Sequence, residues 1–140
     1  MRAYELPFTE YVSVAVCGRV LAGTTGFQSP ADDYEQSRID LAKELVTTIA
    51  SVFCMRVEGG SMEDAGIRDG DILVCDRART PKSGDVVIAD VNELRVVKRL
   101  RVRSGRATLL AEAKDHKAIE VDPEQGVVIV AVVVHAVRTL

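Results

Sequence analysis

The sequence predicts a mainly β fold, a rolled and partly open sheet or sandwich with one short helix and a flexible amino-terminal arm. Three observations lead to this prediction. Short apolar runs alternate with turn residues through the second half of the chain, one earlier stretch has helical spacing, and the first 31 residues have no sustained period. With 140 residues and 47% hydrophobic content, we expect one folded domain, residues 32–140, behind an arm of residues 1–31.

The arm is predicted from its composition. The stretch GRVLAGTTGFQSPADD, residues 18–33, collects Gly, Thr, Ser, Pro and Asp in the manner of a flexible segment. The extreme amino terminus has no apolar run behind a basic start, so it does not resemble a secretory signal.

A helix is predicted over residues 35–51. Asp32 and Asp33 precede it, where negative charge suits a helix start. Its apolar residues fall at helical spacing: Ile39, Ala42, Leu45, Val46 and Ile49.

Strands are predicted after this helix, because the apolar period changes and turn residues separate the runs. The runs are residues 52–57, 69–77, 84–91, 94–103, 107–112, 118–121 and 126–137. The last is rich in Val and far shorter than the ~20 residues that a membrane-spanning helix needs, so we expect a core strand and no membrane association.

Composition restricts the classes of function. A formal charge of -3 and an aromatic share of 4% argue against direct, sequence-specific DNA binding, which uses basic surfaces, and against base-stacking platforms. Cys17, Cys54 and Cys75 form no CxxC pair, so we expect neither disulfides nor zinc, and a cytoplasmic location. The acids of RDGD and ADD lack calcium-loop spacing and are predicted to serve turns and a helix cap, so no metal or cofactor is expected.

Lys98 is the single charge on one face of the predicted strand 94–103. Alternate side chains of a strand point to opposite faces. A buried lysine has a lowered pKa and, when neutral, is a general base. The alternative is that the side chain snorkels, with its stem in the core and its charge in water. The two faces carry Leu94, Val96, Lys98, Leu100 and Val102 on one side and Arg95, Val97, Arg99, Arg101 and Arg103 on the other.

Ser61 stands in VEGGSM, directly after a predicted strand. By itself this pattern also fits an ordinary turn. A nucleophilic serine needs a neighbouring base, and Lys98 is the best candidate. His116, in a charged stretch, and His135, in the Val-rich strand, are competitors for a Ser-His-Asp arrangement, but neither has a motif around it.

Six motifs in order give the chain a specific resemblance: GFQSPADDY, RIDL, VEGGSM, DGDILVCD, GDVVIADV and VVKRL. The sequence resembles the LexA and UmuD family of self-cleaving Ser-Lys peptidases over roughly residues 20–137. The resemblance implies that Ser61 is the nucleophile, that Lys98 is the general base, and that the folded domain is a peptidase domain like the carboxyl-terminal domain of LexA.

The resemblance also implies where the chain is cut. The family cleaves its own arm before a glycine, which maps the bond to Thr25-Gly26. The sequence departs from the pattern here, since alanine or cysteine usually precedes the cut and Thr25 is β-branched and stiff. Backbone N–H groups of Gly60 and Ser61 are the oxyanion candidates.

The implied role is SOS mutagenesis. Cleavage would be stimulated by a RecA filament on single-stranded DNA, and the trimmed homodimer would serve an error-prone, UmuC-like translesion polymerase. Three alternatives stay open: a non-cleaving β module that binds a polymerase, a stand-alone fragment of a phage-type repressor, and a leader peptidase, which the absence of a predicted anchor disfavours.

Overall fold

The computed structural model describes residues 13–20, 22–23, 37–114 and 117–140. The chain divides into two compact units, residues 1–47 and residues 48–140, which are described separately. The predicted cleavage bond Thr25-Gly26 and the predicted arm boundary after residue 31 lie outside the described residues.

The first unit contains a two-stranded antiparallel ribbon followed by one turn of helix. Strand β1 (Ser13–Val16) pairs with β2 (Ser37–Asp40), and helix α1 (Leu41–Leu45) follows at once. Asp40 caps this helix, because its Oδ1 accepts hydrogen bonds from the backbone N–H of Ala42 and of Lys43.

The predicted helix over residues 35–51 is therefore wrong in its extent. Ile39, expected on the helix, lies in β2, and Val46 leaves the helical region with φ -122° and ψ 105°. Helix α1 buries no residue, and Ile49 is 84% exposed. The helical spacing of apolar residues in this stretch does not produce a packed face, and strand pairing with β1 takes its first part.

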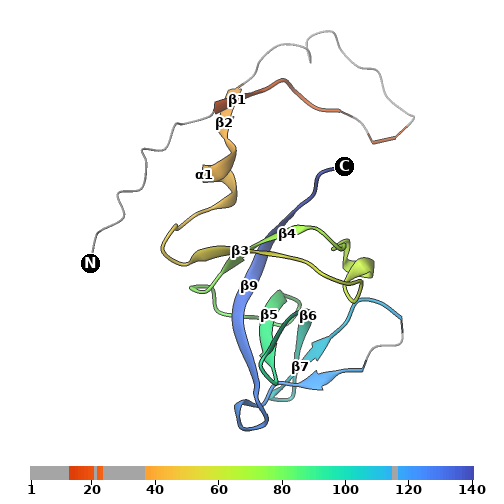
Figure 1. Cartoon of the computed structure of the whole chain (residues 1–140). Helices are drawn as coiled ribbons and strands as arrows, with labels where there is room; N and C mark the ends of the chain where they lie inside the picture. The colour runs from red at the N-terminus through yellow and green to blue at the C-terminus, as the bar shows by residue number, and fades with distance from the viewer. Residues whose placement is uncertain (1–12, 21, 24–36, 115–116) are drawn as a thin grey trace. The chain divides into compact units, whose positions relative to one another are not determined.

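The second unit is a seven-stranded antiparallel sheet, so the mainly β prediction is confirmed (Figure 1). Its order is β3-β4-β9-β5-β6-β7-β8. Two short 3-10 helices, η2 (Glu63–Ala65) and η3 (Pro123–Gln125), occupy connections. The strands are β3 (Val52–Arg56), β4 (Ile72–Asp76), β5 (Val86–Val91), β6 (Leu94–Arg103), β7 (Arg106–Leu110), β8 (Ile119–Glu120) and β9 (Val127–Val137).

Strand β9 lies inside the sheet, between β4 and β5. Its register with each neighbour shifts once, between Val74 and Cys75 of β4 and between Ile88 and Ala89 of β5. Such irregularities bend a strand and increase its twist. They accompany the curled course of the sheet around β5 and β6 in Figure 1.

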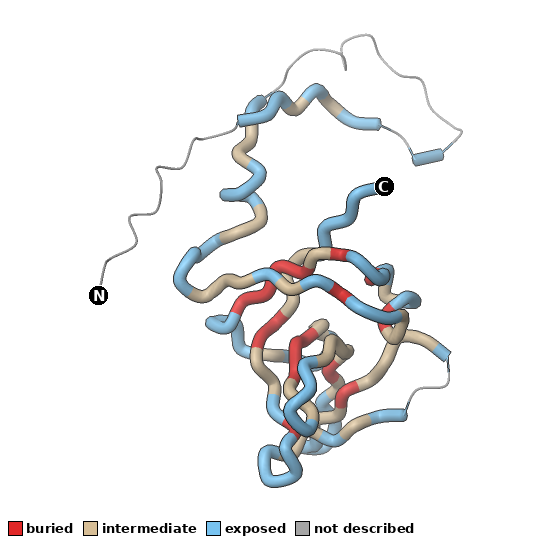
Figure 2. The backbone as a smooth tube through the Cα atoms, viewed as in Figure 1, coloured by how far each residue is buried: buried red, intermediate tan, exposed pale blue. Residues whose placement is uncertain are grey.

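The core of this unit lies on both faces of β5, where buried segments run through the middle of the sheet (Figure 2). Ile88 packs in one hydrophobic cluster, while Val87 and Ala89 pack in another. Strands buried on both faces have continuous apolar runs, as in VVIA of β5. No helix in the described part of the chain is long and apolar enough to cross a membrane.

Candidate active site

Ser61 lies on the turn that follows β3. The turn is tied back by hydrogen bonds from Val57 N to Asp71 O at 2.9 Å and from Gly59 N to Asp69 Oδ1 at 2.9 Å. Gly59 has φ +90°, a conformation that suits only glycine without strain. Met62 is 1% exposed and packs in the core, so the residue after Ser61 is fixed.

Lys98 lies in the middle of β6, opposite Val87 of β5. Val96 and Leu100 pack in the same cluster as Val87, whereas Val97 packs against the other cluster, as the alternation predicted. Lys98 therefore has apolar neighbours on its own face of the sheet: Val96 and Leu100 along β6, and Val87 opposite it on β5.

The predicted apolar face is wrong at its two ends. Leu94 is 71% exposed and Val102 is 43% exposed. Both residues stand next to hairpin turns of β6, beyond the part of the strand that the core covers. In the middle of the predicted face Leu100 is buried, and Val96 and Lys98 are half-buried.

The structure brings Ser61 and Lys98 together across 37 positions of sequence, with Lys98 Nζ 3.1 Å from Ser61 Oγ. This is hydrogen-bonding distance. Desolvation by burial lowers the pKa of Lys98 from its ordinary value of 10.5. The ammonium is not neutralised by an ion pair with any carboxylate among the described residues. A larger share of the side chain is then the neutral amine, which can accept the Ser61 proton.

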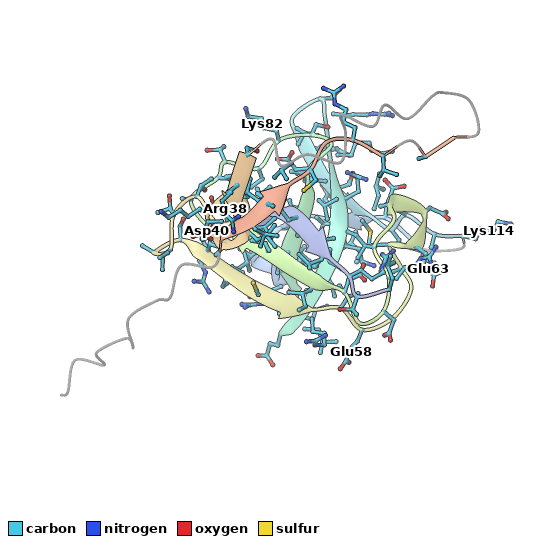
Figure 3. All side chains as sticks on the ribbon, turned by 90° about the horizontal axis from the view of Figure 1, so that it is seen from above. Arg38, Asp40, Glu58, Glu63, Lys82 and Lys114 are labelled. Carbon is cyan, nitrogen blue, oxygen red and sulfur yellow. The ribbon has the colours of Figure 1, made fainter. Side chains whose placement is uncertain are left out.

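The pair opens into a cavity of about 230 Å³. Arg56 and Glu58 bring opposite charges to its lining. Glu58 lies at the lower edge of the molecule in the view of Figure 3, and Lys82 lies at the upper edge. The cavity is lined by Met55, Arg56, Val57, Glu58, Ser61, Leu73, Ile88, Arg95, Val96, Val97 and Lys98.

The backbone around Ser61 offers donors for an oxyanion. Neither the Gly60 N–H nor the Ser61 N–H donates a hydrogen bond to another described residue. A Cβ on Gly60 would come within 2.7 Å of Glu63 Oε1. The absence of a side chain at Gly60 therefore leaves room for the Glu63 side chain beside the turn. The N–H groups of Gly60 and Ser61 remain available as donors.

Glu112, which the sequence did not single out, contacts the Ser61 turn through its backbone. Its N–H donates to Ser61 O at 2.8 Å, and its carbonyl accepts from Asp64 N at 2.7 Å. Its carboxylate accepts from Arg99 Nε at 2.8 Å. The pattern AEAK has no motif that would mark this residue, because its role depends on contacts far apart in sequence.

The acids of RDGD serve the turn, as predicted. Asp71 is 1% exposed and accepts hydrogen bonds from Arg68 N at 2.8 Å and from Arg138 Nε at 2.7 Å and Nη2 at 2.6 Å. The Arg138 guanidinium and the Arg68 N–H lower the pKa of Asp71 to about 2. This contact joins the end of β9 to the loop before β4.

His135 lies in β9, opposite Val74 and away from the cavity lining, and His116 lies outside the described residues. Within the described residues, no three His, Cys, Asp or Glu side chains gather as a metal site would require. The described geometry therefore brings Ser61 together with Lys98 rather than with a histidine.

The chain is similar in sequence to one peptidase family and to several of its relatives. The family described as Peptidase S24-like matches residues 15–134, a range that contains Ser61 and Lys98. The chain is 38% identical to Protein ImpA of Salmonella typhimurium over 113 residues, 81% of this chain and 77% of that protein. It is 39% identical to Protein MucA of Escherichia coli over 114 residues, with the same shares. It is 33% identical to the LexA repressor of Photorhabdus laumondii over 130 residues, 92% of this chain and 63% of that protein.

Proposed function

Because the chain belongs to the Peptidase S24-like family of serine peptidases, together with LexA and UmuD-like proteins, we propose that it is a self-cleaving peptidase with a Ser61-Lys98 dyad. The observation that carries the proposal is the 3.1 Å distance between Lys98 Nζ and Ser61 Oγ at the wall of a cavity. The lowered pKa of Lys98 supports the same assignment, since a base must be neutral to act.

The first chemical step acylates Ser61. The neutral Lys98 amine takes the proton of the Ser61 hydroxyl, and Oγ bonds to the carbonyl carbon of the target peptide. The negative oxygen of the tetrahedral intermediate accepts hydrogen bonds from the N–H groups of Gly60 and Ser61. Collapse breaks the C–N bond, and the Lys98 ammonium gives its proton to the leaving amine.

The second step regenerates the enzyme. Lys98, again neutral, takes a proton from water, and the hydroxide bonds to the ester carbon. The ester C–O bond breaks, the Ser61 oxygen regains a proton from Lys98, and the product leaves with a carboxylate at its new end.

The proposed target is the chain's own bond Thr25-Gly26, in the arm of residues 1–31. The proposal rests on the resemblance of GFQSP to the family's cleavage segment. Thr25 is stiff at χ1 and replaces the usual alanine or cysteine, so we expect slow cleavage.

The proposed setting is SOS mutagenesis in the cytoplasm. A RecA filament on single-stranded DNA would stimulate cleavage, and the trimmed homodimer, residues 26–140, would act as accessory subunit of an error-prone, UmuC-like translesion polymerase. The support is the similarity to Protein ImpA and Protein MucA over 81% of the chain.

The test is incubation of the purified chain from pH 7 to ~10, which spans a lowered and an ordinary lysine pKa, with intact mass as the readout. Ser61→Ala and Lys98→Ala are the controls. We expect fragments 1–25 and 26–140, formed faster at higher pH and absent from both variants.

Addition of RecA with single-stranded DNA should accelerate the same cut. A chain that stays intact at every pH, with and without RecA filaments, would contradict the peptidase proposal and favour a polymerase-binding module. Fragments with a different boundary would keep the dyad and move the target bond.

A further inference from the structure

A small set of hydrogen bonds joins the Ser61 turn to Glu112, in the segment that follows β7. Glu112 N donates to Ser61 O, and Asp64 N donates to Glu112 O. Apart from the contact between Lys98 and Ser61, these are the hydrogen bonds that join residues 60–65 to β6 and β7 or the segment after β7, within the described part of the chain. The backbone of Glu112 therefore sets where the Ser61 backbone lies relative to β6.

Arg99 connects Glu112 to the strand that carries the lysine. Arg99 follows Lys98 directly and lies opposite Leu110 in the register of β6 with β7. Its Nε donates to Glu112 Oε1 at 2.8 Å, and its Nη1 donates to Gly84 O at 2.8 Å. The Arg99 guanidinium thus links Gly84, which lies just before β5, to Glu112, whose backbone is hydrogen-bonded to the Ser61 turn.

This ion pair is a weak candidate for a purely stabilising role. The side chains of Arg99 and Glu112 are 30% and 36% exposed, and pairs with this access to solvent contribute little to folding. Arg95, also on β6, forms an ion pair of similar length with Asp90, at 2.9 Å, but these two residues already face each other in the β5–β6 hairpin. Among the ion pairs of the described residues, the Arg99–Glu112 pair is the one that reaches the segment bonded to Ser61.

We infer that Arg99 and Glu112 form a positioning pair that holds the Ser61 turn at reacting distance from Lys98. The inference rests on the proposed dyad and adds two residues to it that touch neither the substrate nor the reacting atoms. The pair matters because displacement of reacting groups by about 1 Å can slow a reaction about 100-fold.

The test uses Glu112→Ala, Arg99→Met and the double variant of the full chain. Arg79→Met is the matched control, since it removes a largely exposed guanidinium that pairs with the buried Asp76 at 3.9 Å, away from the cavity lining. We expect each single variant to cleave its arm at least about tenfold more slowly than the parent at every pH. The pH midpoint of cleavage should be unchanged, and the Tm should fall no more than in Arg79→Met.

The double variant separates a pair from two independent residues. Residues that act together give a combined loss close to either single loss. Losses that multiply would overturn the pairing. A shifted pH midpoint with an unchanged maximal rate would also overturn it, because the residues would then tune the charge of Lys98 instead of its position.

Hydrogen exchange gives a readout that needs no chemistry. In Glu112→Ala, the amides of residues 64 and 112 should exchange faster, while those of β4 and β9 keep their parent rates. Unchanged exchange at both amides would overturn the inference even if the parent chain cleaves. A parent chain that never cleaves, with faster exchange in Glu112→Ala, would instead contradict the proposed function and leave the positioning contact intact.

Discussion

Asp71 and Lys98 are ionisable groups in the same unit, and their surroundings treat charge in opposite ways. Asp71 is almost fully buried and receives three hydrogen bonds, two of them from the Arg138 guanidinium, so its charge is favoured and its pKa falls to about 2. Lys98 is partly buried, bonds to an uncharged hydroxyl and has no ion-pair partner among the described carboxylates, so the desolvation of its charge is not offset and its pKa is lowered. Satisfied charge stabilises the fold, whereas a disfavoured charge leaves a reactive amine.

Lys98→Arg is expected to have the largest effect, because it removes the proposed general base. A guanidinium can still donate to Ser61 Oγ but stays charged at any accessible pH, so it cannot accept a proton. We expect arm cleavage to slow by about 10²-fold to 10⁴-fold across pH 7 to ~10, as measured by intact mass. Lys82→Arg, at an exposed lysine, should cleave like the parent chain. Equal rates in both variants would place the base elsewhere.

Asp71→Asn removes the buried carboxylate that forms the ion pair with Arg138. Asparagine carries no charge and has one acceptor oxygen, so it cannot replace the ion pair in which Arg138 donates to both carboxylate oxygens. The Tm at pH 7 should fall by several degrees, measured by circular dichroism in a Ser61→Ala background. Glu120→Gln, at an exposed strand position, is the control.

The pH dependence sharpens the same prediction. The folded pKa of Asp71 lies below its ordinary 3.8, so its contribution to stability is present above that value and is lost as pH falls through about 2. The parent chain should lose this contribution as pH falls from 3.8 to about 2, and Asp71→Asn should not. Parallel acid unfolding curves would contradict the assignment.

Substitution of the two glycines before Ser61 tests how strongly the conformation of the Ser61 turn depends on each of them. Gly59→Ala places a side chain at φ +90° and should cost about 1 to 2 kcal/mol in the free energy of unfolding. Gly60→Ala has an ordinary φ and displaces only the end of the flexible Glu63 side chain, so it should cost less. Urea unfolding of both variants provides the comparison, and a larger loss in Gly60→Ala would contradict it.

Lys98→Met has the smallest expected effect, a gain in stability. Because the folded pKa of Lys98 lies below its ordinary value, the parent chain becomes more stable as pH rises between the two values. Methionine removes the penalty for burying a charge, so the variant should have the higher Tm at pH 7. The difference should shrink as pH approaches 10.5, the ordinary pKa of this lysine. A Tm difference independent of pH would point to packing alone.

Short-range patterns singled out the two residues of the candidate site, and the family resemblance implied their roles. Alternation in β6 marked Lys98 as a charge among apolar residues, and the glycine pair after an apolar run marked Ser61. The Val-rich run correctly gave β9. The period of a strand and the chemistry of a turn are enough to mark these residues, but they left an ordinary turn serine and a snorkelling lysine as alternatives.

Contacts between distant residues could not be predicted in the same way. Strand β2 exists through pairing with β1, which overrides the helical spacing around Ile39. The contact between Asp71 and Arg138 spans 67 positions, and the bonds from Glu112 to the Ser61 turn have no sequence motif. The exposed ends of β6 follow from where the core stops, which period alone does not define.

The place of β9 in the sheet has a consequence for synthesis on the ribosome. Ser61 follows β3, next to β4, whereas Lys98 lies in β6, next to β5, and β9 is the strand that hydrogen-bonds β4 to β5. A nascent chain that lacks residues 127–137 has both reactive side chains but no ladder between the strands that carry them. Closure of the sheet, and with it the alignment of Ser61 with Lys98, therefore requires residues 127–137, so under the proposed function a nascent chain does not cut itself before β9 has been synthesised.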